Sequence, residues 1–262
     1  MELPRFGFVA VHRTPLAAGI ATEAQWLARS AELGQAGAHL WTAPPGLVVP
    51  RRYTALPGFS AAAALAAAGG VHGELQVRSS GGGLVPQGPG VWNLSLTWPA
   101  PSASPSDTEA IYRGLCEGLA RALARLGVNA RPQGVDGSFC DGRYNLATGG
   151  AKVAGTAQAW RRVAGVPMVL AHAVIIVSAD PAALTARANA FEAALGTATR
   201  YREDAVTSVA RAAGQRAAGS ADPSGIEARA LVVLAEEFAR LVAPHVHEAE
   251  GGSEASNGER PW

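Results

Sequence analysis

The only lysine of the chain, Lys152, lies in a run of glycine, alanine and valine, where a surface charge is unusual. The chain also has twenty-one arginines, so nearly all of its lysine and arginine positions are arginine. Lysine carries a compact ammonium on a thin stem that can direct three donors into a crowded pocket, whereas arginine carries a wide planar fork. A lysine present by chance is expected in a polar surface run, so we interpret Lys152 as a functional residue rather than as drift.

A second candidate site is the glycine run Gly81, Gly82 and Gly83, which follows Arg78 and Ser80. Consecutive glycines remove every side chain from a stretch of backbone, so a carboxylate, a phosphate or a flat acyl chain can approach the main-chain N–H groups. A flexible turn is the alternative interpretation. The run is not the phosphate loop of nucleoside triphosphatases, because no Gly-Lys-Ser/Thr follows it.

Four amphipathic segments predict the helices that would frame these motifs. They cover about residues 15–33, 106–126, 181–195 and 224–241. Capping-box patterns begin at Ser106 and Ser224, and Asp180 precedes a proline at the start of the third helix. These signals mark three of the four N-termini.

Seven strand-like stretches lie between the helices. They are residues 39–42, 46–49, 73–77, 91–98, 143–148, 151–156 and 168–178. Because the strands come in groups and do not alternate with helices, the pattern predicts an α+β fold of mixed sheets packed with helices. Residues 142–157 are typical of a hairpin with its turn at Gly149-Gly150, which places Lys152 at the start of the returning strand.

Composition limits the function classes and the domain organisation. A net charge of +1 lacks the concentrated basic face that nucleic acid binding needs. The first residues lack a secretory layout, and no apolar run reaches the roughly 18 residues of a membrane span. Two cysteines do not form a disulfide framework. We therefore expect a cytoplasmic protein without a membrane partner, with one catalytic domain over residues 1–247 and a disordered tail over residues 248–262.

Together, the motifs resemble the lipoate–protein ligase and octanoyltransferase family, which shares the catalytic fold of biotin protein ligases. The resemblance rests on Arg78-x-Ser80-Gly-Gly-Gly, Gly90-x-x-Asn93-Leu94-Ser95 and Gly-x-Lys152-x-x-Gly155-Thr156-Ala157, and it spans roughly residues 15–215. Residues 141–146 resemble the Gly-Arg-Asn-Asp stretch that precedes the family lysine, and His172 resembles the start of the His-Gly-Thr strand that follows it. The glycine pattern resembles the lipoate branch rather than the biotin branch.

The resemblance implies acyl transfer to a lysine of a lipoyl carrier domain or of a glycine-cleavage-type carrier protein. In ligases of the family, ATP and Mg²⁺ activate lipoate or octanoate as an acyl-adenylate, which the target lysine attacks. The glycine run would line the acyl channel, and Lys152 would bind the acyl carbonyl and the α-phosphate, where a fixed cation stabilises developing negative charge. The other substrate-binding residues that the motifs imply are Arg78, Ser80, Asn93, Gly155, Thr156, Ala157 and His172. No metal site built by the protein alone is expected.

Departures from the family pattern keep two other hypotheses open. Val77 stands where a second arginine is common, and Gln87-Gly88 where His-Asp is common. After Arg216 there is room for one helix and the tail, so full ligase activity is expected either to need a separate accessory subunit or to be absent.

The first alternative is an octanoyltransferase that takes its acyl group from an acyl carrier protein through a thioester on Cys140, twelve residues before Lys152. An ammonium nearby favours the reactive thiolate. A lone cysteine is also commonly a packed small hydrophobe, the role we expect for Cys116. The second alternative is a non-catalytic family member that binds acyl groups or carrier domains.

Overall fold

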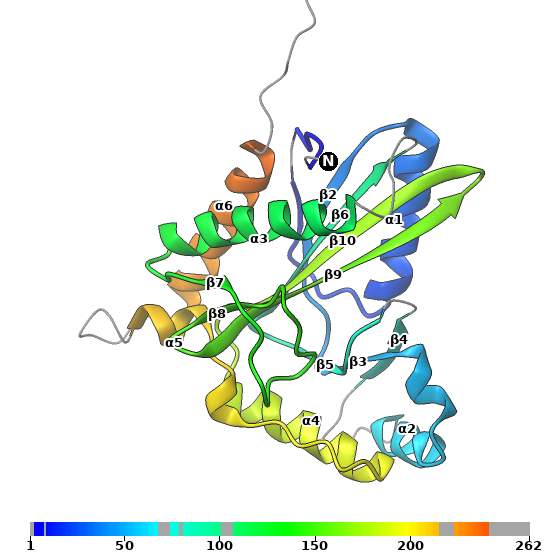
Figure 1. The fold of residues 1–262 in the computed structure, drawn as a ribbon, viewed down its shortest axis with the longest axis vertical. Helices are drawn as coiled ribbons and strands as arrows, with labels where there is room; N and C mark the ends of the chain where they lie inside the picture. Colours follow the sequence, from blue (N-terminus) through cyan, green and yellow to red (C-terminus); the bar gives the residue numbers. More distant parts are fainter. Residues whose placement is uncertain are drawn as a thin grey trace, which may run out of the picture.

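The computed structural model describes residues 3–7, 9–67, 74–78, 81–100, 107–214 and 223–240. Within these ranges, a seven-stranded mixed sheet and a three-stranded sheet pack with helices (Figure 1). The predicted α+β fold is confirmed. The expected tail, residues 248–262, lies outside the described residues.

The large sheet has the strand order β1-β2-β6-β10-β9-β8-β7. Its strands are β1 (Ala10–His12), β2 (Gly37–Trp41), β6 (Val91–Pro99), β7 (Arg131–Pro132), β8 (Leu146–Thr148), β9 (Ala151–Val163) and β10 (Val166–Ile176). β1 and β2 are parallel, and the other neighbours are antiparallel. The small sheet has the order β4-β3-β5, from β3 (Gly46–Pro50), β4 (Glu74–Arg78) and β5 (Val85–Gln87).

The four predicted helices are α1 (Gly19–Leu33), α3 (Asp107–Arg125), α4 (Pro181–Leu195) and α6 (Pro223–Arg240). Asp180 caps α4, since its carboxylate accepts from the backbone N–H groups of Ala182 and Ala183. Ser106 lies outside the described residues. α1 begins four residues later than predicted, at Gly19. The short helix α5 (Val209–Gly214) and the 3₁₀ turns η1 (Arg51–Ala55) and η2 (Glu203–Ala205) were not predicted.

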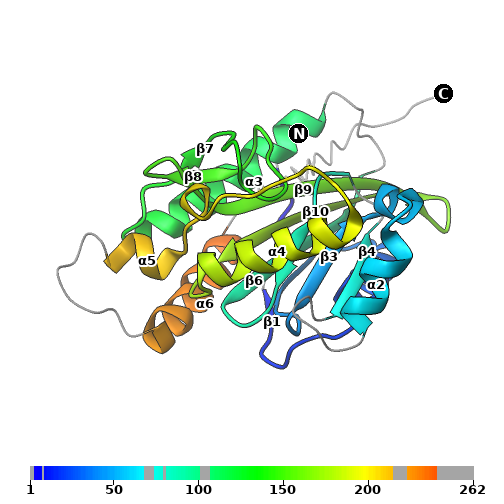
Figure 2. The same ribbon diagram turned by 90° about the horizontal axis from the view of Figure 1, so that it is seen from below.

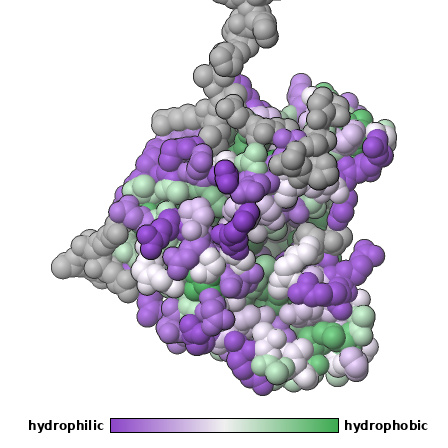
Figure 3. Space-filling view, in the orientation of Figure 1, coloured by the Kyte–Doolittle hydropathy of each residue, from purple (hydrophilic) through white to green (hydrophobic). Residues whose placement is uncertain are grey.

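α2 (Phe59–Ala67) was also not predicted, because its run of alanines shows no amphipathic period. It buries Ala62 and Ala66, one turn apart, and leaves Leu65 53% exposed. The exposed surface of α2 forms the apolar area, coloured green, at the lower right of Figure 3. α2 and α4 contact each other and cover the small sheet on the side away from the large sheet (Figure 2).

The two faces of the large sheet differ in polarity. Leu94 and Leu96 of β6 join an apolar core with α3 and α6, whereas Ser95, between them, bonds to Glu23 of α1. Because alternate strand residues point to opposite faces, α1 covers the polar face and α3 and α6 cover the apolar one. Cys116 of α3 is fully buried in this core, as expected, and burial raises the pKa of its thiol to about 11.

Among the described residues, no helix combines the length and apolar character that crossing a bilayer requires.

Candidate active site

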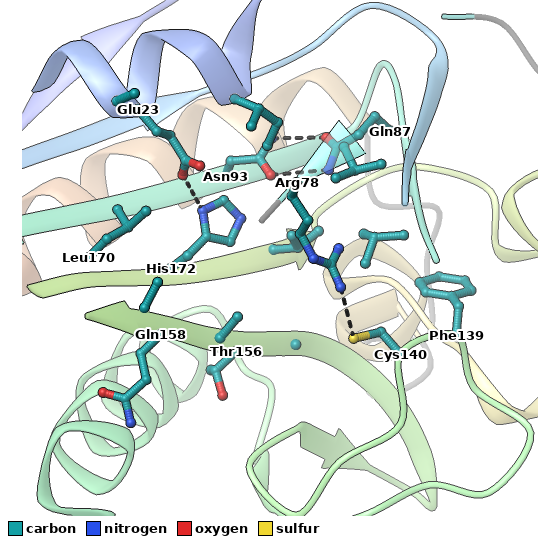
Figure 4. Close-up of a pocket in the computed structure, with 18 of the residues that line it drawn as sticks. Glu23, Arg78, Gln87, Asn93, Phe139, Cys140, Thr156, Gln158, Leu170 and His172 are labelled. Carbon is teal, nitrogen blue, oxygen red and sulfur yellow. Dashed lines mark hydrogen bonds and ion pairs between the residues drawn. The ribbon is translucent and has the colours of Figure 1, made fainter. Parts of the chain in front are cut away.

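A pocket of about 1070 Å³, measured with its open mouth, lies where α1, the small sheet, β9 and β10 meet (Figure 4). Much of its wall is apolar, as a site for an acyl chain requires. The isoleucine, leucine and valine side chains in this wall are Ile20, Leu27, Val48, Val85, Leu170, Val174 and Ile176. Arg78, Cys140 and Lys152 also line this pocket, which we call the acyl pocket after the ligand that the sequence motifs imply.

The β8–β9 hairpin fixes the backbone position of Lys152. Gly149 and Gly150 form its turn with φ values of 59° and 82°, in the left-handed region that glycine adopts readily. Ala147 of β8 pairs with Lys152, the second residue of β9. The predicted hairpin and its turn are therefore confirmed and Lys152 is held on a sheet, although the first strand begins at Leu146 rather than at residue 143.

The Lys152 side chain is only 3% exposed, and its ammonium contacts two main-chain carbonyls. Nζ donates to the carbonyl oxygen of Phe139 at 2.7 Å and to that of Cys140 at 3.0 Å. Burial lowers the pKa of Lys152 from its ordinary value to about 8, against the opposing charge of Asp141. An ammonium has three donors, so these two bonds leave one for a ligand in the pocket.

Gly155 leaves the space that the Lys152 side chain occupies. A Cβ atom built on Gly155 would lie 2.8 Å from Lys152 Nζ and 2.9 Å from its Cε. Any side chain at this position would therefore displace the ammonium. Gly155 also lines the acyl pocket, together with Thr156 and Ala157.

The Cys140 sulfur lies between a backbone N–H and a guanidinium. Sγ accepts from Gly83 N at 3.2 Å and from Arg78 Nη2 at 3.7 Å (Figure 4). Cys140 itself has a φ of 51°, which is uncommon for a residue other than glycine. In this conformation the carbonyl oxygen of Cys140 accepts from Lys152 Nζ at 3.0 Å and from Asn145 Nδ2 at 3.5 Å.

The glycine run packs directly against Cys140. A Cβ atom on Gly82 would lie 2.7 Å from Sγ, and one on Gly83 would lie 3.1 Å from the Cys140 Cα. Arg78 binds the backbone of the run, since its guanidinium donates to the carbonyl oxygens of Gly81 and Gly83. Because the run has no side chains, its backbone can lie directly against Cys140.

A second, more polar pocket lies beside the acyl pocket. Its lining is Arg52, Tyr53, Gly82, Gly83, Ser138, Cys140, Asp141, Thr199 and Tyr201. Cys140 lines both pockets, and Gly82 and Gly83 line this polar pocket rather than the acyl pocket. Ser80 lies outside the described residues.

His172 belongs to a buried polar network at the acyl pocket. Glu23 Oε1 lies 2.6 Å from His172 Nδ1 and accepts from Ser95 Oγ at 2.6 Å. Trp41 Nε1 donates to the same Ser95 oxygen at 2.8 Å. Sequence reasoning did not identify Glu23, although an acidic residue between Ile20 and Leu27 on the apolar face of a helix was a usable signal.

Asn93 forms a reciprocal amide pair with Gln87 in the wall of the acyl pocket. Asn93 Nδ2 donates to Gln87 Oε1 at 2.9 Å, and Gln87 Nε2 donates to Asn93 Oδ1 at 3.2 Å. Both side chains are buried. The glutamine that departs from the family pattern thus has a partner within the site.

The described residues contain no group of three or more His, Cys, Asp or Glu side chains that could hold a metal ion.

Comparisons with known sequences agree with this geometry. Residues 18–218 match the model of the lipoyl protein ligase A/B catalytic domain. An uncharacterised protein of Cupriavidus necator is 47% identical over 191 residues, which are 68% of this chain and 75% of that protein. The octanoyl-[GcvH]:protein N-octanoyltransferase of Kyrpidia tusciae is 42% identical over 113 residues, but this match spans 41% of this chain and only 38% of that enzyme.

Solved structures share the fold. Lipoate-protein ligase A bound with ATP aligns with a TM-score of 0.61 and 16% identity, over 92% of this chain and 85% of that one. A putative lipoate protein ligase of T. acidophilum with bound lipoic acid aligns with a TM-score of 0.57 and 19% identity, over 91% and 86% of the two chains. With the family model matching more than half of its length, the chain belongs to the lipoyl protein ligase A/B catalytic domain family, whose members are acyl-transferring enzymes.

Proposed function

We propose that this protein transfers an octanoyl or lipoyl group to a lysine of a lipoyl carrier domain through a thioester on Cys140. The observation that supports the proposal is the place of the sulfur, which lies in the acyl pocket between Gly83 N–H and Arg78. The partial match to an octanoyl-[GcvH]:protein N-octanoyltransferase supports a protein-bound octanoyl donor.

The first half-reaction would load Cys140. The apolar wall accepts the acyl chain, while the Arg78 guanidinium and the Gly83 N–H stabilise negative charge on the sulfur. The thiolate attacks the acyl carbonyl carbon, a C–S bond forms, and the leaving group of the donor departs with the bonding electrons and takes up a proton. The remaining N–H of Lys152 is available to stabilise the carbonyl oxygen as it becomes negative.

The second half-reaction would return the thiol. The ε-amino group of the carrier lysine attacks the thioester carbonyl, so a C–N bond forms and the C–S bond breaks. The thiolate leaves with the electron pair, and one proton of the amine is released. Because the Lys152 pKa of about 8 lies above neutral pH, its ammonium is mostly charged at pH 7, as charge stabilisation requires.

ATP-dependent ligation is the second candidate, and Arg161 is the observation that favours it. Arg161 and Lys152 both line the acyl pocket and could hold the carboxylate and an α-phosphate. The one carboxylate in the pocket lining, that of Glu23, is already bonded to Ser95 and paired with His172. A magnesium ion would therefore depend on phosphate oxygens and water, which Mg²⁺ accepts. In that case the adenylate would supply the activated acyl group.

Two donors distinguish the candidates. The purified protein is incubated with an apo lipoyl domain and either an octanoylated carrier protein without ATP, or octanoate with ATP and Mg²⁺. We expect transfer without ATP and an octanoylated enzyme in the intact mass spectrum. Both should be lost in Cys140→Ala and kept in Cys116→Ala, a matched control in which the replaced thiol is buried in the core.

Other outcomes would refute the proposal. Modification that requires ATP and persists in Cys140→Ala would establish the ligase. Binding of the carrier without modification from either donor would establish a non-catalytic family member.

A further inference from the structure

The polar pocket meets the acyl pocket at Cys140 and differs from it in chemistry. Its walls come from η1, the glycine run, residues 138–141 and the segment before η2. Its side chains are hydroxyl groups, one carboxylate and Arg52, which is exposed and lies over the Tyr53 ring at 5.4 Å. A thioester on Cys140 would thus have an apolar space on one side and a polar space on the other.

Two tyrosines in the polar pocket can only accept hydrogen bonds from a ligand. Tyr53 and Tyr201 both donate their hydroxyl hydrogens to Glu192 Oε1, each at 2.8 Å. Glu192 is fully buried and also accepts from Thr197 Oγ1 at 2.5 Å. Burial raises the pKa of both tyrosines, so the phenols stay protonated and their oxygens keep lone pairs.

Asp141 and Ser138 add two more groups that can accept. Asp141 Oδ1 accepts from Val135 N at 2.7 Å and from Gly142 N at 2.8 Å, which fixes the carboxylate beside the pocket. Ser138 is 4% exposed, and its Oγ has no hydrogen-bond partner within the part of the protein that is described. Because Ser138 lines the polar pocket, this unpartnered hydroxyl is available to a ligand there.

The polar groups around Cys140 are therefore of two kinds, hydrogen-bond donors and hydrogen-bond acceptors. Arg78, Lys152 and Gly83 N–H are donors, suited to the sulfur and to the acyl oxygen. Asp141, Ser138 and the tyrosine oxygens are acceptors, suited to an amine. We propose that the polar pocket binds the ε-amino group of the carrier lysine, with the Asp141 carboxylate and the Ser138 hydroxyl as its main acceptors. This assignment rests on the proposed function and adds the place of the nucleophile.

Two proton transfers would accompany the attack of the carrier lysine on the thioester. The carrier lysine enters as an ammonium attracted by Asp141, and loses one proton to that carboxylate, which passes it to solvent. The neutral nitrogen forms the C–N bond as the C–S bond breaks, and the thiolate takes the bonding electrons. A second proton then leaves the new amide nitrogen, and the Cys140 thiolate can take it up.

The test measures how one acyl-enzyme divides between two acceptors. The full chain is octanoylated on Cys140 with 4-nitrophenyl octanoate, and is then exposed to increasing Nα-acetyl-lysine methylamide. Aminolysis and hydrolysis use the same electrophile and leaving group, so their ratio cancels changes in either. We expect Asp141→Asn and Ser138→Ala each to lower the ratio about tenfold or more, as loss of a hydrogen bond to a charged group predicts.

Matched controls separate binding from stability. Asp136→Asn removes a carboxylate that is 99% exposed in the same loop, and Thr185→Val removes another buried hydroxyl that lacks a partner among the described residues. Neither residue lines either pocket, so both should keep the ratio of the unsubstituted chain. Ser138→Thr, which retains a hydroxyl, should recover part of the loss.

Two results would overturn the assignment in different ways. If the acyl-enzyme forms but Asp141→Asn and Ser138→Ala keep the full ratio, the amine binds elsewhere and the proposed function stands. If the unsubstituted chain forms no acyl-enzyme, the proposed function is wrong and the assignment falls with it.

Discussion

The substitution Gly155→Ala tests whether the position of the Lys152 ammonium, rather than its presence, supports catalysis. A Cβ at Gly155 would lie 2.8 Å from Nζ, while ordinary contact begins at 3.4 Å, so the ammonium must move by at least about 0.6 Å. Its bonds to the Phe139 and Cys140 carbonyls, now 2.7 and 3.0 Å long, would lengthen or break. Displacement of a catalytic group by about 1 Å can cost about a hundredfold in rate.

Stability should change much less than activity. The atom that must move is the free end of a flexible side chain, and alanine also restricts the unfolded chain more than glycine does. We expect a loss of about 1 kcal/mol in the free energy of unfolding, or about 2–4 °C in melting temperature for a chain of this size. The acylation rate should fall about a hundredfold in single-turnover measurements.

Gly142→Ala is the matched control, because a Cβ at Gly142 would have no atom within 4 Å. It should keep both the acylation rate and the melting temperature. Acylation of Cys140 in Gly155→Ala within threefold of the unsubstituted rate would contradict a role for the position of the ammonium. A rate that falls only in step with unfolding would contradict it too, since the lysine position would then have no separate effect.

Four further results are expected. Acylation should slow as the pH rises through about 8, where the Lys152 ammonium is lost. An ordinary lysine would lose its charge near pH 10.4, so a rate that stays constant up to pH 10 would contradict the lowering of the Lys152 pKa by burial. Because this pKa is lowered in the folded state, Lys152 should also make the free energy of unfolding rise with pH between about 8 and 10.4, as denaturant titrations can show. Glu192→Ala should lower the free energy of unfolding by about 3 kcal/mol, since the hydroxyl donors of the buried Tyr53 and of the partly buried Thr197 and Tyr201 lose their acceptor. Glu192→Gln should cost less, and equal melting temperatures would refute this. Val174→Phe should narrow the acyl pocket and shift preference toward shorter chains in a competition between acyl donors.

Local signals in the sequence were sufficient for the elements that hold Lys152. Two adjacent glycines between strand-like residues predicted the β8–β9 turn, and the cap at Asp180 predicted the start of α4. These features depend on neighbours within a few residues, where backbone preferences decide the structure. β5, with three residues, and the alanine-rich α2 offer no such period, and their place depends on packing with distant segments.

Most contacts of the site could not be predicted from local signals, because they join residues that are far apart in the sequence. His172 and Glu23 meet across 149 positions of the chain, and Tyr53 and Glu192 across 139. The sequence identified His172 by resemblance, but it could not show which acid would face it. Buried acids such as Glu192, on the apolar face of α4 beside Phe191, are the one class of partner that a helical pattern can reveal in advance.

The preference for lysine at position 152 now has a physical explanation. The side chain passes through space that only a glycine at position 155 leaves open, and its ammonium bridges two consecutive carbonyls, at Phe139 and Cys140. A guanidinium is a wide planar fork, whereas the lysine stem is thin and its ammonium compact, so arginine fits this opening less well. Lys152→Arg would therefore release the Cys140 backbone, with its φ of 51°, as well as move the charge. In the proposed reaction the lysine has two roles, contacting the cysteine backbone and stabilising the acyl oxygen, and a substitution at Lys152 removes both together. Gly155→Ala keeps the ammonium and shifts it, which makes the neighbouring glycine the sharper test of the lysine.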